Sequence, residues 1–220
     1  DVWLPNKMEL TLQRLKQVEN TCGIDVPIAV FSDMYVTDEN LMIRSDSFLK
    51  EIDRDAGYHS YSEILIDNPA AGCTMAFNRA CRDRAIAIKN KDRVLMHDVW
   101  FLMVAAVFGE VIAVREPLVY YRQHEKNEMG SQTESSWQKV SRNLQDAQAK
   151  ELLSKKEAFY KEKQDLAREI LNLPDVPEEK REVLEQFVCL HDMGFLQKLL
   201  FLKKNKIRRK RHNLWFMLHI

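Results

Sequence analysis

The amino-acid sequence predicts an α/β fold, a mixed sheet with flanking helices, followed by an all-helical C-terminal region. The apolar run 28–31 has the length of a strand and suits one that is covered on both faces, as in a parallel or mixed sheet. An apolar helix that begins near residue 97 leads into two β-rich runs, 111–114 and 118–121. Beyond Gly130 strand formers become rare and charged helical patterns follow.

The change at Gly130 predicts a domain boundary. We expect residues 1–130 to form the α/β domain and residues 131–220 to form a helical extension. A hydrophobic content of 45% with 30% charged residues fits a globular protein rather than a disordered one. No apolar run approaches the roughly 20 residues that span a bilayer.

The cysteines show neither CxxC spacing nor a dense framework. They are Cys22, Cys73, Cys81 and Cys189. This pattern favours a reduced, cytoplasmic protein in which the thiols are buried small apolar groups.

The first part of the chain is predicted to form a helix, a strand and a turn. Asn6 is a plausible cap for a helix that ends near Asn20 and carries an apolar stripe. The stripe consists of Met8, Leu10, Leu12, Leu15 and Val18. After the strand 28–31, Asp33 is either a ligand-binding residue at the carboxyl end of that strand or a turn-forming residue. A turn is expected at 37–40.

Short elements are expected next. The pattern predicts helices at 45–52 and 58–66. The small residues of 70–77 run into a strand-like stretch, and Gly72 among them would allow the backbone to come close to a ligand. Asn78 is suited to cap the helix that follows.

The stretch 96–127 has titratable groups at both ends of a buried helix and strands. Such an arrangement is typical of a site, because packed elements hold polar groups at fixed separation. At its start, Asp98 is either a general base or, as is usual for an Asp at a helix start, a cap for free N–H groups. At its end, His124 is a candidate ligand for metal or phosphate. Trp100 and the other apolar residues at helical spacing are expected in the core.

The extension is predicted to contain a polar linker, two helices and a basic tail. These segments are 131–136, 137–173, 178–190 and 194–220. The tail contains eight Lys or Arg and no acid, with Trp and Phe beside them. It therefore suits a helix on an anionic membrane surface or a helix docked on its own protein with a solvated basic face. No base-reading motif accompanies the charge, so we expect no nucleic-acid partner.

Five segments of the chain, taken in order, carry a family resemblance. They are 1–7 (DVWLPNK), 31–34 (FSDM) with Asp38, 72–78 (GCTMAFN), 97–100 (HDVW), and 121–124 (YRQH) with Asn127. In this order and at these intervals they resemble motifs of family 2 glycosyltransferases of the GT-A fold, especially the bacterial rhamnosyltransferase-like branch. The resemblance implies that the chain holds part of a Rossmann-like GT-A sheet.

The resemblance also implies a role for each site residue. Asp98 would be the base that deprotonates the acceptor hydroxyl as it attacks the anomeric carbon, with inversion. Asp1 and His124 would hold Mg²⁺ or Mn²⁺, and Arg122 with His124 would bind the donor diphosphate. The acceptor side would be lined by Gly72, Cys73, Thr74, His97 and Trp100.

The implied activity is transfer of a sugar from a nucleotide-sugar donor to a saccharide or lipid-linked acceptor. It would serve cell-surface polysaccharide synthesis at the cytoplasmic face of the membrane. Family members bind the nucleotide base and ribose through an N-terminal half that this sequence does not contain. We therefore expect this fragment alone to be inactive, with a sheet edge that promotes association. The alternative is a non-catalytic α/β module whose basic helical tail recruits a membrane or protein partner.

Overall fold

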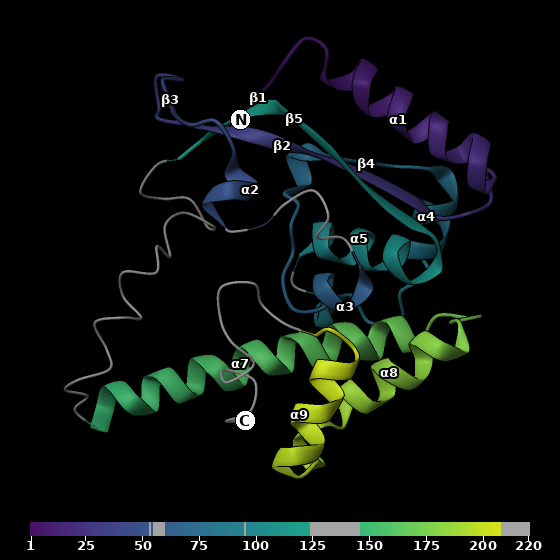
Figure 1. The fold of residues 1–220 in the computed structure, drawn as a ribbon, viewed down its shortest axis with the longest axis vertical. Helices are drawn as coiled ribbons and strands as arrows, with labels where there is room; N and C mark the ends of the chain where they lie inside the picture. Colours follow the sequence, from purple (N-terminus) through teal and green to yellow (C-terminus); the bar gives the residue numbers. More distant parts are fainter. Residues whose placement is uncertain (53, 55–59, 95, 124–145, 208–220) are drawn as a thin grey trace.

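The computed structural model describes residues 1–52, 54, 60–94, 96–123 and 146–207. In these residues a mixed open sheet of five strands is flanked by helices, and the C-terminal region is helical (Figure 1). The predicted fold class is therefore confirmed. The helix α1 lies on one side of the sheet and α5 on the other, and α7 and α8 form a further layer beyond α5 (Figure 1).

The sheet is built around two long parallel strands. The strands are β1 (Val2–Trp3), β2 (Ile28–Thr37), β3 (Ile43–Ser45), β4 (Met75–Phe77) and β5 (Glu110–Arg122). The order is β1-β5-β2-β3, and β4 also pairs with β2. The β2–β5 pair is parallel, whereas β1, β3 and β4 run antiparallel to their neighbours. The two long strands therefore end at the same side of the sheet.

Both long strands exceed the predicted lengths. The strand β2 continues past residue 31 to Thr37, and β5 is one strand where two short runs were expected. Pairing between the two strands continues across Ser32–Tyr35 and Val114–Pro117 through shifts in register. Polar residues thus interrupt the apolar pattern of each strand, but the two strands remain paired on both sides of these residues.

The helices before residue 123 are short apart from two. They are α1 (Lys7–Cys22), α2 (Phe48–Glu51), α3 (Tyr61–Ile64), α4 (Arg79–Ala85) and α5 (His97–Phe108), with 3-10 turns η1 (Gly72–Thr74) and η2 (Lys91–Arg93). The predicted helices at 45–52 and 58–66 exist but are shorter. Asn78 caps α4 as expected, since its side chain accepts a hydrogen bond of 2.9 Å from Cys81 N. Asp38 Oδ1 accepts from Asn40 N and Met42 N in the expected turn.

The start of α1 differs from the prediction in two ways. The Asn6 side chain makes no capping hydrogen bond. The buried face of the helix consists of Lys7, Thr11 and Leu15, whereas Met8 and Leu12 of the predicted stripe are exposed. Lys7 N donates to Leu4 O at the end of the β1 segment, which fixes the helix rotation so that this face meets the sheet.

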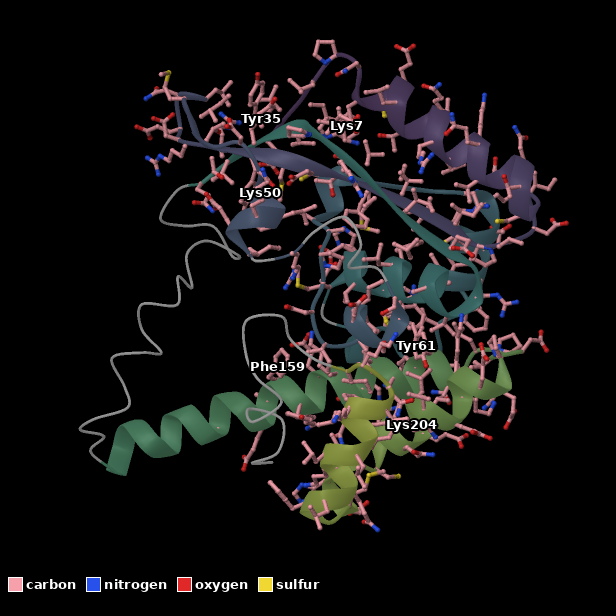
Figure 2. All side chains as sticks on the ribbon, viewed as in Figure 1. Lys7, Tyr35, Lys50, Tyr61, Phe159 and Lys204 are labelled. Carbon is pink, nitrogen blue, oxygen red and sulfur yellow. The ribbon has the colours of Figure 1, made fainter. Side chains whose placement is uncertain are left out.

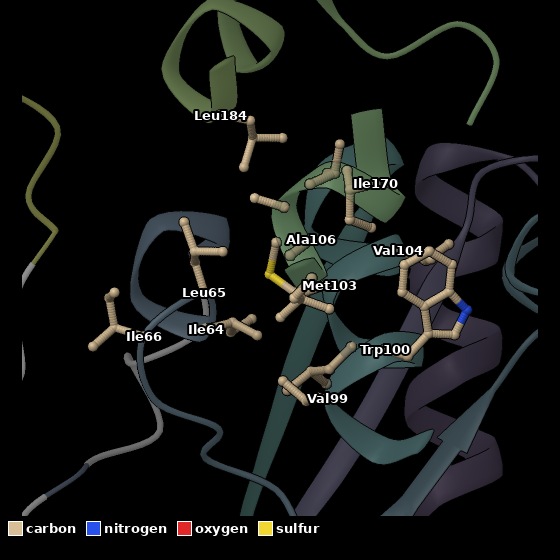
Figure 3. Close-up of a cluster of buried hydrophobic side chains, with 14 of the residues drawn as sticks. Ile64, Leu65, Ile66, Val99, Trp100, Met103, Val104, Ala106, Ile170 and Leu184 are labelled. Carbon is tan, nitrogen blue, oxygen red and sulfur yellow. The ribbon is translucent and has the colours of Figure 1, made fainter. Parts of the chain in front are cut away.

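The helical extension shares one core with the α/β part. It contains α7 (Asp146–Leu171), α8 (Glu178–Val188), the 3-10 turn η3 (Leu190–Asp192) and α9 (Phe195–Lys204). Ile170 of α7 and Leu184 of α8 belong to the same buried cluster as Trp100, Met103 and Val104 of α5 (Figure 3). The predicted linker 131–136 and the start of the helix predicted at 137–173 lie outside the described residues.

Polar contacts also join the extension to α5 and η2. Lys180 Nζ donates to the carbonyls of Ala106 and Val107, at 3.1 and 2.9 Å, where α5 has no further helical N–H groups. The buried carboxylate of Glu169 accepts from Asn90 N at 3.2 Å and pairs with Arg93 Nη1 at 3.1 Å. The extension is therefore bound to the helix that begins with His97–Asp98.

Candidate functional site

Asp98 lies in the first turn of α5 and its side chain is buried. Its Oδ1 accepts one hydrogen bond, of 2.7 Å, from the N–H of Val99. Among the described residues its other oxygen has no hydrogen-bond partner, and the carboxylate forms no ion pair. This bond satisfies one free N–H of the first helical turn, as the capping interpretation predicts, although Met96 occupies the N-cap position and makes no side-chain bond. Asp98 therefore retains capacity to accept a proton or hydrogen bond.

The turn η1 brings Gly72 against His97. A Cβ built on Gly72 would lie 2.7 Å from His97 Nε2, so the glycine backbone is in direct contact with the imidazole. Both residues are exposed, and η1 touches both long strands of the sheet. Gly72 and His97 thus lie together at the surface next to Asp98, and their role in acceptor binding stays a prediction.

Cys73 shows which charged groups surround this turn. The thiol is partly buried, and burial raises its pKa. The positive charge of Lys7 opposes that rise in pKa, whereas the carboxylate of Asp98 adds to it. Lys7 and Asp98 therefore act on the same thiol, although they are distant in the sequence.

Lys7 was not among the residues predicted for the site. Its side chain is 1% exposed and its Nζ lies 4.1 Å from the centre of the Trp3 ring. Burial lowers the pKa of Lys7, and the nearby Cys73 opposes this decrease. Figure 2 labels Lys7 beside the long strands of the sheet, near the start of α1. Its positive charge is therefore held beside the same turn as Cys73.

Two of the predicted acceptor-binding residues do not fit that role. Trp100 is 4% exposed, lies in the core between helices, and donates from its indole N–H to Ala85 O at 2.9 Å. Thr74 is 1% exposed and its hydroxyl donates to Ala71 O at 2.7 Å. Both side chains are occupied inside the protein, so an acceptor cannot contact them. The helical spacing that predicted Trp100 to be core was correct.

Asp1 and Arg122 lie at one end of the sheet. Val2 pairs with Tyr120, which places Asp1 across from the last residues of β5. Arg122 is the final residue of β5, pairs with Thr37 of β2, and is exposed. His124, predicted for the metal and the diphosphate, lies outside the described residues.

The described residues do not by themselves form a metal site. No group of three or more His, Cys, Asp or Glu side chains that could hold a metal ion occurs in the ranges given above. Asp1 is exposed and supplies one carboxylate. Mg²⁺ or Mn²⁺ on Asp1 and His124 therefore stays a prediction.

Asp33, the other candidate carboxylate, is fully engaged in the fold. Its Oδ1 accepts from Met34 N at 2.8 Å and Leu49 N at 3.1 Å, and its Oδ2 accepts from Ser47 Oγ at 2.5 Å. Ser47 in turn caps α2 through Lys50 N. These bonds fasten α2 to β2, so Asp33 has a structural role, although it lies within β2 and not in the turn that was the alternative to ligand binding.

The described part of the basic tail is α9 with the residues that follow it. Phe195, Leu196 and Leu200 are 55%, 69% and 66% exposed. Lys203 and Lys204 are exposed on the same helix, while Phe201 and Leu202 are buried against the core. One side of α9 is thus packed and the other presents apolar and cationic groups to solvent. The tail from residue 208 lies outside the described residues.

Comparison of the chain with models of protein families, with curated proteins and with solved structures finds no match. In the part of the chain that the structure describes, no helix combines the length and the apolar character needed to cross a membrane.

One pattern in the sequence is consistent with the burial of Lys7. Lys7, Thr11 and Leu15 are spaced four residues apart and therefore lie on one helix face. The apolar stripe was chosen by residue type, and this excluded a lysine from the buried face. To choose the face of Lys7, Thr11 and Leu15 instead, the rotation of the helix relative to the preceding strand would have to be known.

Proposed function

We propose that this chain is part of an inverting glycosyltransferase of family 2 with a partial GT-A fold. One observation carries the proposal: the buried Asp98 carboxylate has an oxygen without a partner among the described residues, beside exposed Gly72 and His97. A base needs such an oxygen, held in place and within reach of a substrate hydroxyl. The family motifs at these same positions support the assignment.

The proposed reaction is a single displacement at the anomeric carbon of a nucleotide sugar. The acceptor hydroxyl oxygen forms a bond to that carbon, and the bond from the carbon to the diphosphate oxygen breaks. Asp98 takes the hydroxyl proton, and the electron pair of the broken bond leaves with the nucleoside diphosphate. The acceptor is a saccharide or lipid-linked sugar that lies against Gly72, Cys73 and His97. Val99 N fixes the orientation of the carboxylate.

The donor side is proposed from residues at the end of the sheet. Arg122 at the end of β5 would offset charge on the leaving diphosphate, together with His124. A divalent cation, Mg²⁺ or Mn²⁺, would polarise the diphosphate when bound. Asp1 and His124 would hold this cation.

The experiment is a sugar-transfer assay on the whole protein that carries this sequence, with Mn²⁺ and a panel of UDP, GDP and dTDP sugars. We expect Asp98→Asn to lower kcat by about 100-fold or more, because a positioned general base contributes roughly that factor. Asp92→Asn is the matched control, since Asp92 is exposed in η2. Equal turnover in wild type and Asp98→Asn would remove Asp98 as the base, and absence of nucleotide binding would remove the enzyme assignment.

The exposed side of α9 favours a second function for the extension. Apolar side chains at residues 195, 196 and 200 with lysines at 203 and 204 suit the surface of an anionic membrane. The protein would then act at the cytoplasmic face of the plasma membrane, where a lipid-linked acceptor is available. If the sugar-transfer assay fails, this surface supports the alternative function, recruitment by a non-catalytic α/β module.

A further inference from the structure

Lys7 is a buried cation whose counter-charge is missing from the described residues. Two other covered lysines have oxygen partners: buried Lys163 pairs with Glu162 at 2.7 Å, and half-buried Lys180 donates to two carbonyls. Among the described residues, the Lys7 ammonium has no hydrogen-bond acceptor and no carboxylate within ion-pair distance. The Lys7 Nζ lies 4.1 Å from the centre of the Trp3 ring, and the Cys73 thiol is close enough to influence the pKa of Lys7. Burial of an unpaired charge is unfavourable unless a ligand supplies the opposite charge.

The position of Lys7 adds to its positive potential. Lys7 is the first residue of the 16-residue helix α1, whose N-terminus is not capped by the Asn6 side chain. Free N–H groups and the helix dipole make such an end attractive to anions. The Cys73 thiol does not supply the counter-charge, because burial raises its pKa and so favours the neutral form.

Cys73 connects Lys7 to the proposed base. The thiol lies within electrostatic reach of the Lys7 ammonium and of the Asp98 carboxylate, which act on it in opposite directions. An inverting displacement needs a base on one side of the anomeric carbon and an anionic leaving group on the other. A carboxylate and a separate buried cation, each near the same turn, meet both requirements.

We propose that the Lys7 ammonium binds a phosphate oxygen of the donor's diphosphate, under the ring of Trp3. This inference rests on the proposed function, and it assigns a donor-binding role to a residue that was not among those predicted for the site. In the reaction, Lys7 stabilises the negative charge that develops on the leaving diphosphate. It transfers no proton.

The direct test is calorimetric titration of the whole protein with inorganic pyrophosphate in the presence of EDTA. Wild type, Lys7→Gln and Lys7→Arg are compared, with Lys16→Gln as control because Lys16 is exposed on the same helix. We expect Lys7→Gln to weaken binding about 10-fold or more and Lys16→Gln to change it less than about 2-fold, as for loss of one charged hydrogen bond. Equal dissociation constants for wild type and Lys7→Gln would overturn the proposal.

A second measurement needs no substitution and decides the matter if Lys7→Gln does not fold. Alkylation of Cys73 by iodoacetamide is followed by peptide mass spectrometry with and without pyrophosphate, and exposed Cys22 is the internal control. An anion on Lys7 removes a positive charge that favours the thiolate, so we expect Cys73 to react at least about 3-fold more slowly while Cys22 is unchanged. An unchanged rate at Cys73 would contradict binding at Lys7.

The experiments distinguish failure of the proposed glycosyltransferase function from failure of the proposed role of Lys7. If pyrophosphate binding depends on Lys7 but no sugar is transferred, the anion site stands and the glycosyltransferase function is wrong. If sugar transfer depends on Asp98 while Lys7→Gln changes neither pyrophosphate binding nor KM for the nucleotide sugar, the function stands and the role of Lys7 is wrong.

Discussion

Gly72 of η1 and His97 of α5 are in contact: a Cβ placed on Gly72 would stand 2.7 Å from His97 Nε2 and 3.4 Å from Cε1. Real side chains do not approach so closely, so any residue larger than glycine requires the imidazole to move. This contact links the turn that carries Cys73 to the helix that carries Asp98.

Substitution of this glycine should change the site more than the fold. In Gly72→Ala the exposed imidazole is expected to turn away, which costs little because its outer atoms can move. We expect the free energy of unfolding to change by less than about 1 kcal/mol, while KM for the acceptor rises. Urea unfolding and acceptor titration check the two parts. Gly194→Ala is the matched control, since its Cβ would meet Gln197 Oε1 at an ordinary 3.7 Å. Loss of folding in Gly72→Ala would contradict the expected freedom of His97.

The four cysteines should react with iodoacetamide in an order set by burial. Cys22 and Cys189 are exposed, Cys73 is partly buried with a raised pKa, and burial raises the pKa of Cys81 to about 12. Because the thiolate is the nucleophile, we expect the exposed pair to react first, Cys73 more slowly, and Cys81 hardly at all at pH 8. Peptide mapping of native protein measures each rate, and all four should react alike in urea. Labelling of native Cys81 as fast as Cys22 would contradict its position in the core.

The same buried thiol should make stability depend on alkaline pH. The pKa of Cys81 is raised from 9.0 to about 12 in the folded protein, so the unfolded chain loses this proton first as pH rises. The stability contributed by the neutral thiol is therefore complete below pH 9 and falls as pH increases from about 9 towards 12. Urea unfolding at pH 8 and pH 10.5 measures the loss in wild type, and Cys81→Ala should lose less. Equal losses in both proteins would show that Cys81 does not contribute.

The ion pair between Arg93 and Glu169 should contribute to stability. Glu169 is fully buried and accepts from Asn90 N besides Arg93, so Arg93→Leu leaves a buried carboxylate with one donor. We expect this change to lower the free energy of unfolding by about 1–3 kcal/mol. Arg82→Leu removes an exposed pair with Asp83 and should change it by less than about 1 kcal/mol. Urea unfolding of both variants decides, and equal small effects would mean that the pair does not join the extension to η2.

The exposed side of α9 should bind anionic vesicles. The test variant carries Gln at Lys203, Lys204 and Lys206, and the control carries Gln at exposed Lys16, Lys89 and Lys91. Each lysine near an anionic surface contributes roughly 1 kcal/mol, so we expect the test variant to bind phosphatidylserine vesicles about 10-fold or more weakly than the control. Co-sedimentation with phosphatidylserine vesicles measures binding to an anionic surface, and co-sedimentation with phosphatidylcholine vesicles measures the binding that does not depend on lipid charge. Binding of equal strength in the two variants would show that α9 does not face the membrane.

The sequence predicted whether each major element is a helix or a strand better than it predicted the first and last residues of the element. The run 28–31 was correctly identified as a strand, but the polar pair Ser32–Asp33 suggested an end that the strand does not have. Asp33 is compatible with the sheet because Ser47 and Leu49, distant in sequence, bond its carboxylate. Likewise two runs, 111–114 and 118–121, were expected where β5 is one strand, and Pro117 between them pairs with Asp33. Long-range contacts of this kind are not visible in a local pattern.

The candidate site could be predicted in part. Asp98 was identified from the helix start, Gly72 from the small residues of 70–77, and Cys73 and His97 from the resemblance. The structure brings these residues close together. Trp100 was predicted both as a core residue and as an acceptor-binding residue, and its burial favours the core. Lys7 was missed because a lysine is normally expected at the surface, and only the docking of α1 on the sheet shows that its side chain is covered.

The contact of Lys180 with the last carbonyls of α5 bears on how such a protein can change in evolution. A helical extension taken from another protein would have to supply an ammonium for Ala106 and Val107, a carboxylate for Arg93, and apolar side chains to cover Met103. Few unrelated extensions would meet all of these requirements at once. The α/β part and its extension are therefore expected to be inherited as one unit, with exchange between relatives limited to the exposed side of α9.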